Sequence, residues 1–155
     1  MPSQSEYGRE RRLVLFNTHT REKLDVCYAR GESYRSEALS AVNHILRDHR
    51  TNEVNPIDPR LLDLLCAIRS KAGPDACLHI ISGYRSPGTN RRLRQQGRGV
   101  ARKSLHMQGH AADIRIPGLA TSRLRRMALT LRQGGVGYYP QSDFVHVDIG
   151  PVRSW

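Results

Sequence analysis

The segment Ser104–Ile116, SLHMQGHAADIRI, restricts what this chain can fold into more than any other stretch of it. Gly109 allows a tight turn between a loop that carries His106 and a strand that begins near Ala112. Along that strand apolar residues alternate with polar ones, so the Asp113 side chain points away from the apolar face. We therefore expect an imidazole from the loop and a carboxylate from the strand to converge on one metal ion.

A second segment, FVHVDI at residues 144–149, alternates in the same way. His146 and Asp148 share one face of this strand, because successive side chains of a strand point to opposite sides. Two neutral imidazoles and one carboxylate leave the fourth position of a tetrahedral zinc ion open for water, which is the arrangement of catalytic rather than structural zinc sites. The sequence therefore predicts one Zn²⁺ per chain, with His106, Asp113 and His146 as ligands.

Other candidate ligands fit this pattern less well. His110 forms an HxxxH pair with His106, and this spacing binds zinc when both residues lie on a helix. Gly109 and the strand pattern after it argue against a helix, so His110 is expected beside the site rather than in it. The cysteines form no CxxC pair and lie far from any cluster of histidines, which argues against a zinc-thiolate site: Cys27, Cys66 and Cys77.

Hydrophobic periodicity predicts the remaining elements of the fold. The expected helices are 33–49, 58–72, 86–97 and 121–133. The expected strands are 11–18, 23–29, 77–82, 112–116, 136–139 and 144–149. Because the helices come in a block between strands that mostly follow one another, we predict an α+β fold with a mainly antiparallel sheet and helices packed on one side. Residues 11–155 are expected to form a single domain, and residues 1–10 to be disordered.

Composition limits the class of protein. The chain has 155 residues, 38% of them apolar, which suffices for one domain with a real core. No apolar stretch approaches the roughly 20 residues needed to cross a bilayer, so no membrane span is predicted. The first residues, Met1–Arg12, are polar and charged, and we expect any export signal to lie outside this sequence.

The net charge of +11 is concentrated in Asn90–Lys103, where five arginines and one lysine occur without a single acid. Such a stretch favours a polyanionic partner, and nucleic acid, anionic lipid and carboxylate-rich peptidoglycan all meet that description. The few aromatic residues form no recognisable nucleic-acid-binding motif, so nucleic acid is not predicted as a partner.

The spacing SxHxxGxAxD, followed by a late histidine, resembles the metallopeptidase superfamily of D-alanyl-D-alanine carboxypeptidases, L-alanyl-D-glutamate endopeptidases and hedgehog domains. The chain is most similar to the murein endopeptidase K branch, in stretches that run through most of the sequence: RRLVLFNTHTREKL, NPIDPRLLDLL, SGYRSPGTN and GGVGYYPQSDFVHVDIGPVRSW. The resemblance implies zinc on the three predicted ligands and an antiparallel sheet with helices on one side. It also implies hydrolysis of peptidoglycan cross-links, with the peptide stems as substrate, in the periplasm or cell envelope.

The resemblance further implies roles for individual residues. Related enzymes carry the general base three residues before the last histidine ligand, which here is Asp143, and a turn leaves this side chain free to reach a water. Asp148 is the alternative, because strand alternation places it beside His146, where it could act as base or hold a ligand ring in one tautomer. Arg85 resembles an arginine that binds a substrate carboxylate or stabilises the oxyanion. Ser104 either hydrogen-bonds the substrate backbone or shapes its loop.

Two alternatives to an endopeptidase stay open at this point. One is a D,D- or L,D-carboxypeptidase on the same scaffold, and the other is a non-catalytic, zinc-containing module that binds the cell wall. Asp143 and Asp148 favour an enzyme, because a binding module needs no proton acceptor beside an open metal position. The choice of bond depends on the shape of the substrate groove, which loops determine.

Overall fold

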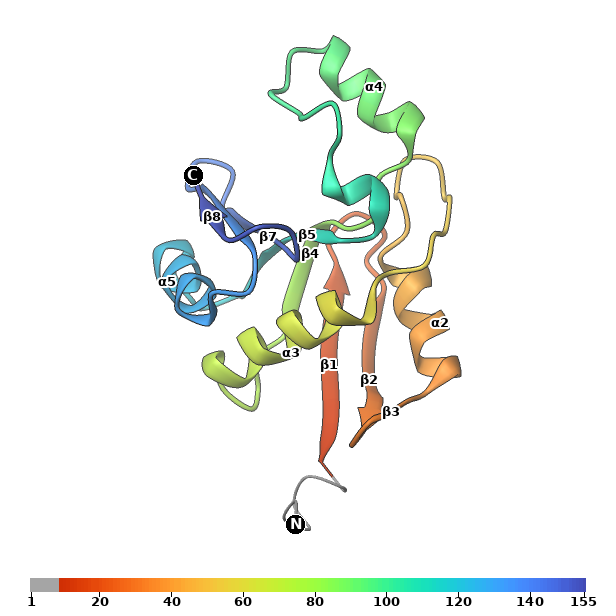
Figure 1. Cartoon of the computed structure of the whole chain (residues 1–155), viewed down its shortest axis with the longest axis vertical. Helices are drawn as coiled ribbons and strands as arrows, with labels where there is room; N and C mark the ends of the chain where they lie inside the picture. The colour runs from red at the N-terminus through yellow and green to blue at the C-terminus, as the bar shows by residue number, and fades with distance from the viewer. Residues whose placement is uncertain (1–8) are drawn as a thin grey trace.

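The computed structural model of the chain describes residues 9–155, shown from N- to C-terminus in Figure 1. The strands are β1 (Glu10–Asn17), β2 (Lys23–Arg30), β3 (Ser33–Tyr34), β4 (Leu78–Ser82), β5 (Ala111–Arg115), β6 (Gly135–Tyr139), β7 (Phe144–Asp148) and β8 (Arg153–Ser154). The helices are α2 (Ser36–Ile45), α3 (Pro59–Ala72), α4 (Pro87–Gln95), the 3-10 helix η1 (Leu105–Gln108) and α5 (Thr121–Leu131).

The strands form one sheet in the order β3-β2-β1-β4-β5-β7-β6-β8. Neighbours pair antiparallel except at two places, where β1 runs parallel to β4 and β6 runs parallel to β8. The β1–β4 pair is parallel because α2 and α3 intervene in the chain and return it to the same end of the sheet. The predicted α+β fold with a mainly antiparallel sheet is thus confirmed.

The hydrophobic core lies between one face of the sheet and the helices. Leu13 and Leu15 of β1 are fully buried, and Val145 and Val147 of β7 belong to the same buried cluster. Helices α2, α3 and α5 contact the strands of the sheet, and α3 crosses in front of β1 in Figure 1. The predicted packing on one side holds for these helices, whereas α4 stands beyond the end of the sheet, at the top of Figure 1.

Both ends of the helix predicted at residues 33–49 differ from the prediction. The helix expected at residues 33–49 is shorter, because Ser33 and Tyr34 pair with β2 as the edge strand β3. At its other end the Asp48 carboxylate accepts a hydrogen bond from the Arg50 backbone N–H at 2.9 Å. A local bond of this kind competes with helical hydrogen bonding, so the chain turns instead of continuing as a helix.

Two small elements near the site were not predicted. Strand β8 has two residues and η1 has four, and segments this short carry no measurable periodicity. The disorder predicted for residues 1–10 falls on residues outside the described range, apart from Arg9 and Glu10, and Glu10 begins β1. In the described part of the chain, every helix is too short or too polar to cross a membrane.

Candidate metal centre and active site

Asp113 and His146 meet because β5 and β7 pair in a fixed register. Asp113 lies directly opposite His146 in this antiparallel pair, and Ile114 lies opposite Val145. Directly opposed residues project to the same face of a sheet, so the two polar side chains share one face while the two apolar side chains enter the core. The candidate site therefore lies on the face of the sheet that α2, α3 and α5 leave open.

His106 reaches the same place from η1. The Ser104 hydroxyl caps this 3-10 helix by accepting a hydrogen bond from the His106 N–H at 3.2 Å. Gly109 ends it in the left-handed conformation, with φ of 70°, and a side chain there would collide with the carbonyl of Pro56. The turn that the sequence placed at Gly109 therefore folds His106 back over β5.

The three predicted ligands converge. His106 Nε2 lies 3.2 Å and His146 Nδ1 lies 3.0 Å from the same oxygen, Oδ1 of Asp113. One potential ligand atom from each residue lies within 4.8 Å of the other two. The other nitrogen of His106, Nδ1, lies 2.8 Å from the carbonyl of Gly83 and donates a hydrogen bond to it, which leaves Nε2 with a free lone pair.

The electrostatics of the cluster favour a cation. Burial alone would raise the pKa of the Asp113 carboxyl, but the adjacent imidazoles of His106 and His146 outweigh burial and hold it below its ordinary value. Burial would lower the pKa of His146, but hydrogen bonds to Asp113 and Asp148 raise it. A buried carboxylate kept ionised between two imidazoles is a suitable anionic centre for a metal ion.

Asp148 is fully buried and closely surrounded by donors. Oδ2 accepts from His146 Nε2 at 2.7 Å and from Arg153 Nη2 at 2.9 Å, and Oδ1 accepts from the backbone N–H groups of Gly135 and Gly150, each at 2.9 Å. Burial opposes ionisation, but these bonds lower the pKa of Asp148 below its ordinary value. In this geometry the Asp148 carboxylate orients His146. Few of its lone pairs are left to accept a proton from a water molecule, as a general base must.

Asp143 lies elsewhere. It is exposed in the turn between β6 and β7, with a positive φ of 56°. Its carboxylate accepts a hydrogen bond from the hydroxyl of Thr121 and lies 3.9 Å from Nε of Arg115. It is not among the residues that line the cavity at the metal cluster. A direct role for Asp143 therefore requires the turn to move when substrate binds.

Arg85 is buried beside the cluster without a carboxylate partner among the described residues. Its Nη1 makes only long contacts, 3.3 Å to Asn90 Oδ1 and 3.4 Å to Ser104 Oγ, and its Nε has no partner. Burial lowers the pKa of this guanidinium, opposed by the charge of Asp113. A buried cation with unused donors at a cavity is a ready site for an anionic group.

The cavity above the cluster has a volume of about 320 Å³. Its floor contains His106, Asp113 and His146, and one side is formed by basic residues of the segment that follows α4, including Arg98 and Lys103. The other side carries aromatic and basic residues from β6, β7, β8 and the residue after β8: Tyr139, Phe144, Arg153 and Trp155. We call residues 87–104, α4 and the segment after it, the arginine arm.

Comparison with known proteins agrees with this geometry. A family model described as peptidoglycan L,D-endopeptidase MepK, one of the M15 peptidases, matches residues 5–155. The chain belongs to this family. It is 47% identical over 147 residues to the peptidoglycan L,D-endopeptidases MepK of Escherichia coli K12 and Shigella flexneri, covering 95% of this chain and 81% of each relative. A Haemophilus influenzae protein named as a probable peptidoglycan L,D-endopeptidase MepK is 41% identical over 144 residues, covering 92% of this chain and 77% of that protein.

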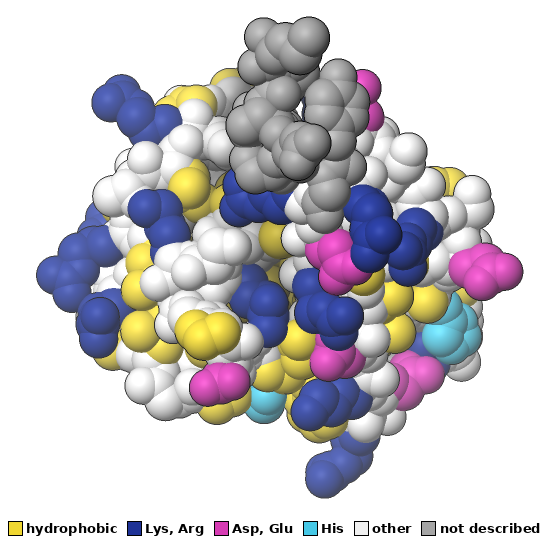
Figure 2. Space-filling model, turned by 90° about the horizontal axis from the view of Figure 1, so that it is seen from below, with side chains coloured by type: hydrophobic (Ala, Val, Ile, Leu, Met, Phe, Trp, Pro, Cys, Tyr) yellow, Lys and Arg dark blue, Asp and Glu magenta, His cyan; other side chains and the backbone are white. Residues whose placement is uncertain are grey.

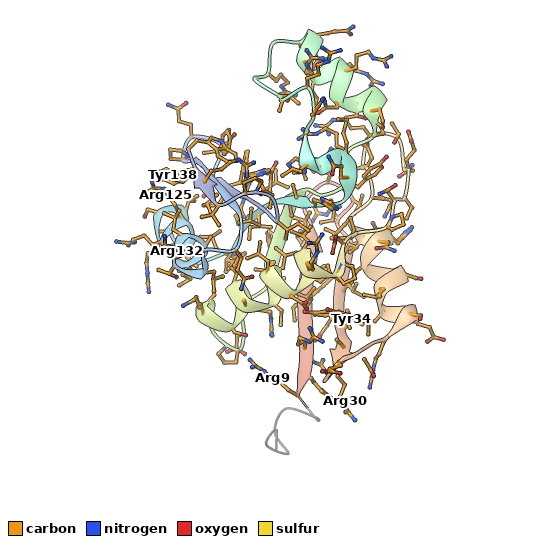
Figure 3. All side chains as sticks on the ribbon, in the orientation of Figure 1. Arg9, Arg30, Tyr34, Arg125, Arg132 and Tyr138 are labelled. Atoms are coloured by element: carbon orange, nitrogen blue, oxygen red, sulfur yellow. The ribbon has the colours of Figure 1, made fainter. Side chains whose placement is uncertain are left out.

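Sequence reasoning missed some residues that this family member places at the site. Asp48 lies far away in the chain, yet its Oδ2 accepts from the Ser86 N–H at 3.0 Å and so fixes the loop that presents Arg85. Tyr139 faces the cavity, whereas its neighbour Tyr138 lies under Arg125 of α5, 5.2 Å from guanidinium to ring (Figure 3). Strand alternation separates these two tyrosines, but the sequence alone does not say which face holds the site.

Proposed function

We propose that this chain is a zinc-dependent peptidoglycan endopeptidase that hydrolyses a peptide bond between an L and a D centre in the cross-links. The observation that carries the proposal is the convergence of His106, Asp113 and His146 in a cavity that Arg85, whose Nε has no partner, also lines. Membership of the MepK family supports the substrate and the bond, because its curated relatives are named for this activity.

The donor set fits one Zn²⁺ ion. His106 Nε2, His146 Nδ1 and an oxygen of Asp113 are the nitrogen and oxygen ligands that zinc accepts, and the remaining nitrogen of each imidazole already has a partner. When bound, zinc polarises a carbonyl and lowers the pKa of a water molecule to near neutrality. A site with three protein ligands is the arrangement of zinc hydrolases rather than of structural zinc.

The chain's own residues then have separate tasks. Arg85 binds a carboxylate of the peptide stem or the developing oxyanion, because its guanidinium is buried at the cavity and holds unused donors. Ser104 shapes the loop by capping η1, and its hydroxyl lies 3.4 Å from Arg85 Nη1. Asp148 keeps His146 in one tautomer. Asp143 remains the proposed proton acceptor, since Asp148 is already fully engaged with donors.

The proposed partner is the peptide stem of peptidoglycan, which carries free carboxylates. The arginine arm is complementary to such a polymer, because it bears six basic side chains and no acid between Asn90 and Lys103. Peptidoglycan lies outside the cytoplasm, so the proposal places the protein in the periplasm or cell envelope. The few aromatic residues form no recognisable nucleic-acid-binding motif, and we propose no nucleic-acid partner.

The test is cleavage of purified cross-linked muropeptides, followed by mass analysis of the products. Substrates linked from diaminopimelate to diaminopimelate should be cut, those linked from D-alanine to diaminopimelate should survive, and a chelator should stop the reaction until zinc is restored. Release of a terminal D-alanine instead of a cross-link would identify a carboxypeptidase. Binding to sacculi without any product would identify a cell-wall-binding module.

A further inference from the structure

The orientation of His146 depends on a carboxylate that itself needs support. His146 Nε2 donates to Asp148 Oδ2 at 2.7 Å, which directs Nδ1 towards Asp113, 3.0 Å away. Asp148 has no solvent exposure, so its orientation is set entirely by protein donors. Any group that fixes Asp148 therefore also fixes the direction of the His146 lone pair.

Arg153 supplies that group. Its Nη1 lies 3.1 Å from Asp148 Oδ1 and its Nη2 lies 2.9 Å from Oδ2, so one planar guanidinium binds both oxygens of the carboxylate. A two-pronged contact of this kind fixes the plane of a carboxylate, which a single hydrogen bond does not. Among the described residues, His146 and Arg153 are the only side chains that form an ion pair with Asp148.

The surrounding backbone leaves room for this pair and holds it in place. A Cβ at Gly135 would lie only 2.6 Å from Asp148 Oδ2 and would collide with the Arg153 guanidinium, so the pair requires glycine at this position. Arg153 lies opposite Gly135 in the parallel β6–β8 pair. Two residues after Arg153, the backbone N–H of Trp155 donates a hydrogen bond to the carbonyl of Val136 in β6 at 3.1 Å.

Side-chain contacts continue this arrangement up to the cavity. The Arg153 guanidinium lies over the Trp155 ring, 5.0 Å from its centroid. The indole N–H of Trp155 donates to the Tyr139 hydroxyl at 2.8 Å, and the indole ring lies 5.2 Å from the His146 ring. Strand β8 thus places the guanidinium of Arg153 next to the carboxylate that binds His146, a candidate metal ligand. The periodicity of the sequence predicts no helix or strand in this segment.

We propose that Arg153 is a positioning residue of the metal site, which acts through Asp148 to keep His146 Nδ1 directed at the ion. The inference rests on the proposed zinc site and goes beyond it by assigning zinc affinity to a residue outside the ligand set. Without Arg153 the carboxylate keeps its backbone donors but loses the contact that fixes its plane, and His146 loses its fixed orientation. Residues that hold metal ligands typically contribute 10- to 100-fold to metal affinity.

The experiment measures the zinc dissociation constant of the metal-free full chain by competition with a chromogenic chelator. We expect Arg153→Ala to weaken zinc binding by roughly 10- to 100-fold. Arg153→Lys should fall between Ala and the wild type, because an ammonium is a point charge that cannot bind both oxygens in one plane. Saturating zinc should restore most of the turnover of both variants, as expected for a residue that acts by positioning a metal ligand.

Arg12→Ala is the matched control, because Arg12 also pairs with an aspartate, Asp25, but at an exposed position on β1 and β2. Its zinc affinity should equal that of the wild type. Circular dichroism and thermal melting establish that each variant is folded, and Arg153→Lys provides the test if Arg153→Ala does not fold. A folded Arg153 variant with wild-type zinc affinity overturns the inference alone, whereas a wild-type chain that binds no zinc overturns the proposed function as well.

Discussion

The two sides of the cavity use charge in opposite ways. On the sheet side, the carboxylates of Asp113 and Asp148 are buried and bonded to specific donors from β7, β8 and η1. On the arginine arm, Arg98 and Lys103 line the cavity but pair with no carboxylate among the described residues. The face of the molecule seen in Figure 2 differs from both, because acidic side chains lie between the basic ones there.

This difference separates two functions of a charged side chain. A buried charge with a full set of partners has one low-energy arrangement, so it can hold a metal ion within a narrow range of geometry. An exposed cation without a partner has no fixed geometry, but its field attracts anions over the screening length of about 8 Å at physiological salt. We therefore expect changes on the sheet side to be large and local, and changes on the arm to be small and dependent on salt.

The largest expected effect is at the candidate metal ligands, on the sheet side of the cavity. Replacing His106 or His146 with alanine should abolish both stoichiometric zinc and cleavage, because two remaining ligands hold zinc poorly. Metal content by mass spectrometry and product formation from muropeptides measure the two effects. His110→Ala is the control and should keep both, since His110 lies 3.5 Å from Asp58 rather than in the cluster. Zinc that persists after loss of both histidines would transfer a ligand role to His110.

The two candidate bases give the next largest effect. Asp143→Asn should keep zinc affinity but lower turnover by roughly two to four orders of magnitude, as loss of a general base does. Asp148→Asn should instead weaken zinc binding by roughly 10- to 100-fold, because it changes the group that holds His146 in one tautomer. Zinc titration and kcat on the same samples separate these outcomes. Full zinc affinity with no turnover in Asp148→Asn would make Asp148 the base.

Arg85 shares one property with each side of the cavity: it is buried like the carboxylates of the sheet side, and it is a cation without a carboxylate partner like the residues of the arginine arm. Because Arg85 is buried beside the cluster and its Nε has no partner, Arg85→Ala should reduce cleavage of small soluble muropeptides by about 10²- to 10³-fold at every ionic strength. Zinc affinity should not change, because Arg85 bonds to none of the three candidate ligand side chains. Rates over a salt series test this, and a loss of activity that appears only at low salt would place Arg85 with the arm.

The arm should give the smallest effect. Neutralising two exposed arginines of α4, Arg91→Gln with Arg94→Gln, should weaken binding to intact sacculi a few-fold at low salt and leave cleavage of small muropeptides unchanged. The matched control changes Arg123 and Arg126, two exposed arginines of α5, to glutamine. Sedimentation with sacculi at several salt concentrations measures the effect. Equal losses in the two double variants would show that only net charge matters, and not its position.

Much of the site followed from local patterns in the sequence. Alternation in β5 and β7 predicted that Asp113 and His146 face away from the core, and Gly109 predicted the turn that returns His106 to the strand. These predictions succeed because a period of two residues and a left-handed glycine are properties of a few consecutive residues. The choice between Asp143 and Asp148 did not follow, because it depends on what surrounds each carboxylate after folding.

The sequence by itself determined the chemical set at this site: two imidazoles and one carboxylate at fixed spacing, an arginine in SGYRS and an arm without acids. Only the tertiary structure decided which side chains support that set. Asp48 fixes the Arg85 loop, and Arg153 binds Asp148 from a two-residue strand that pairs with β6. Such contacts join residues distant in the chain or in elements too short to have a period, so they arise only when the sheet register and the core bring those residues together.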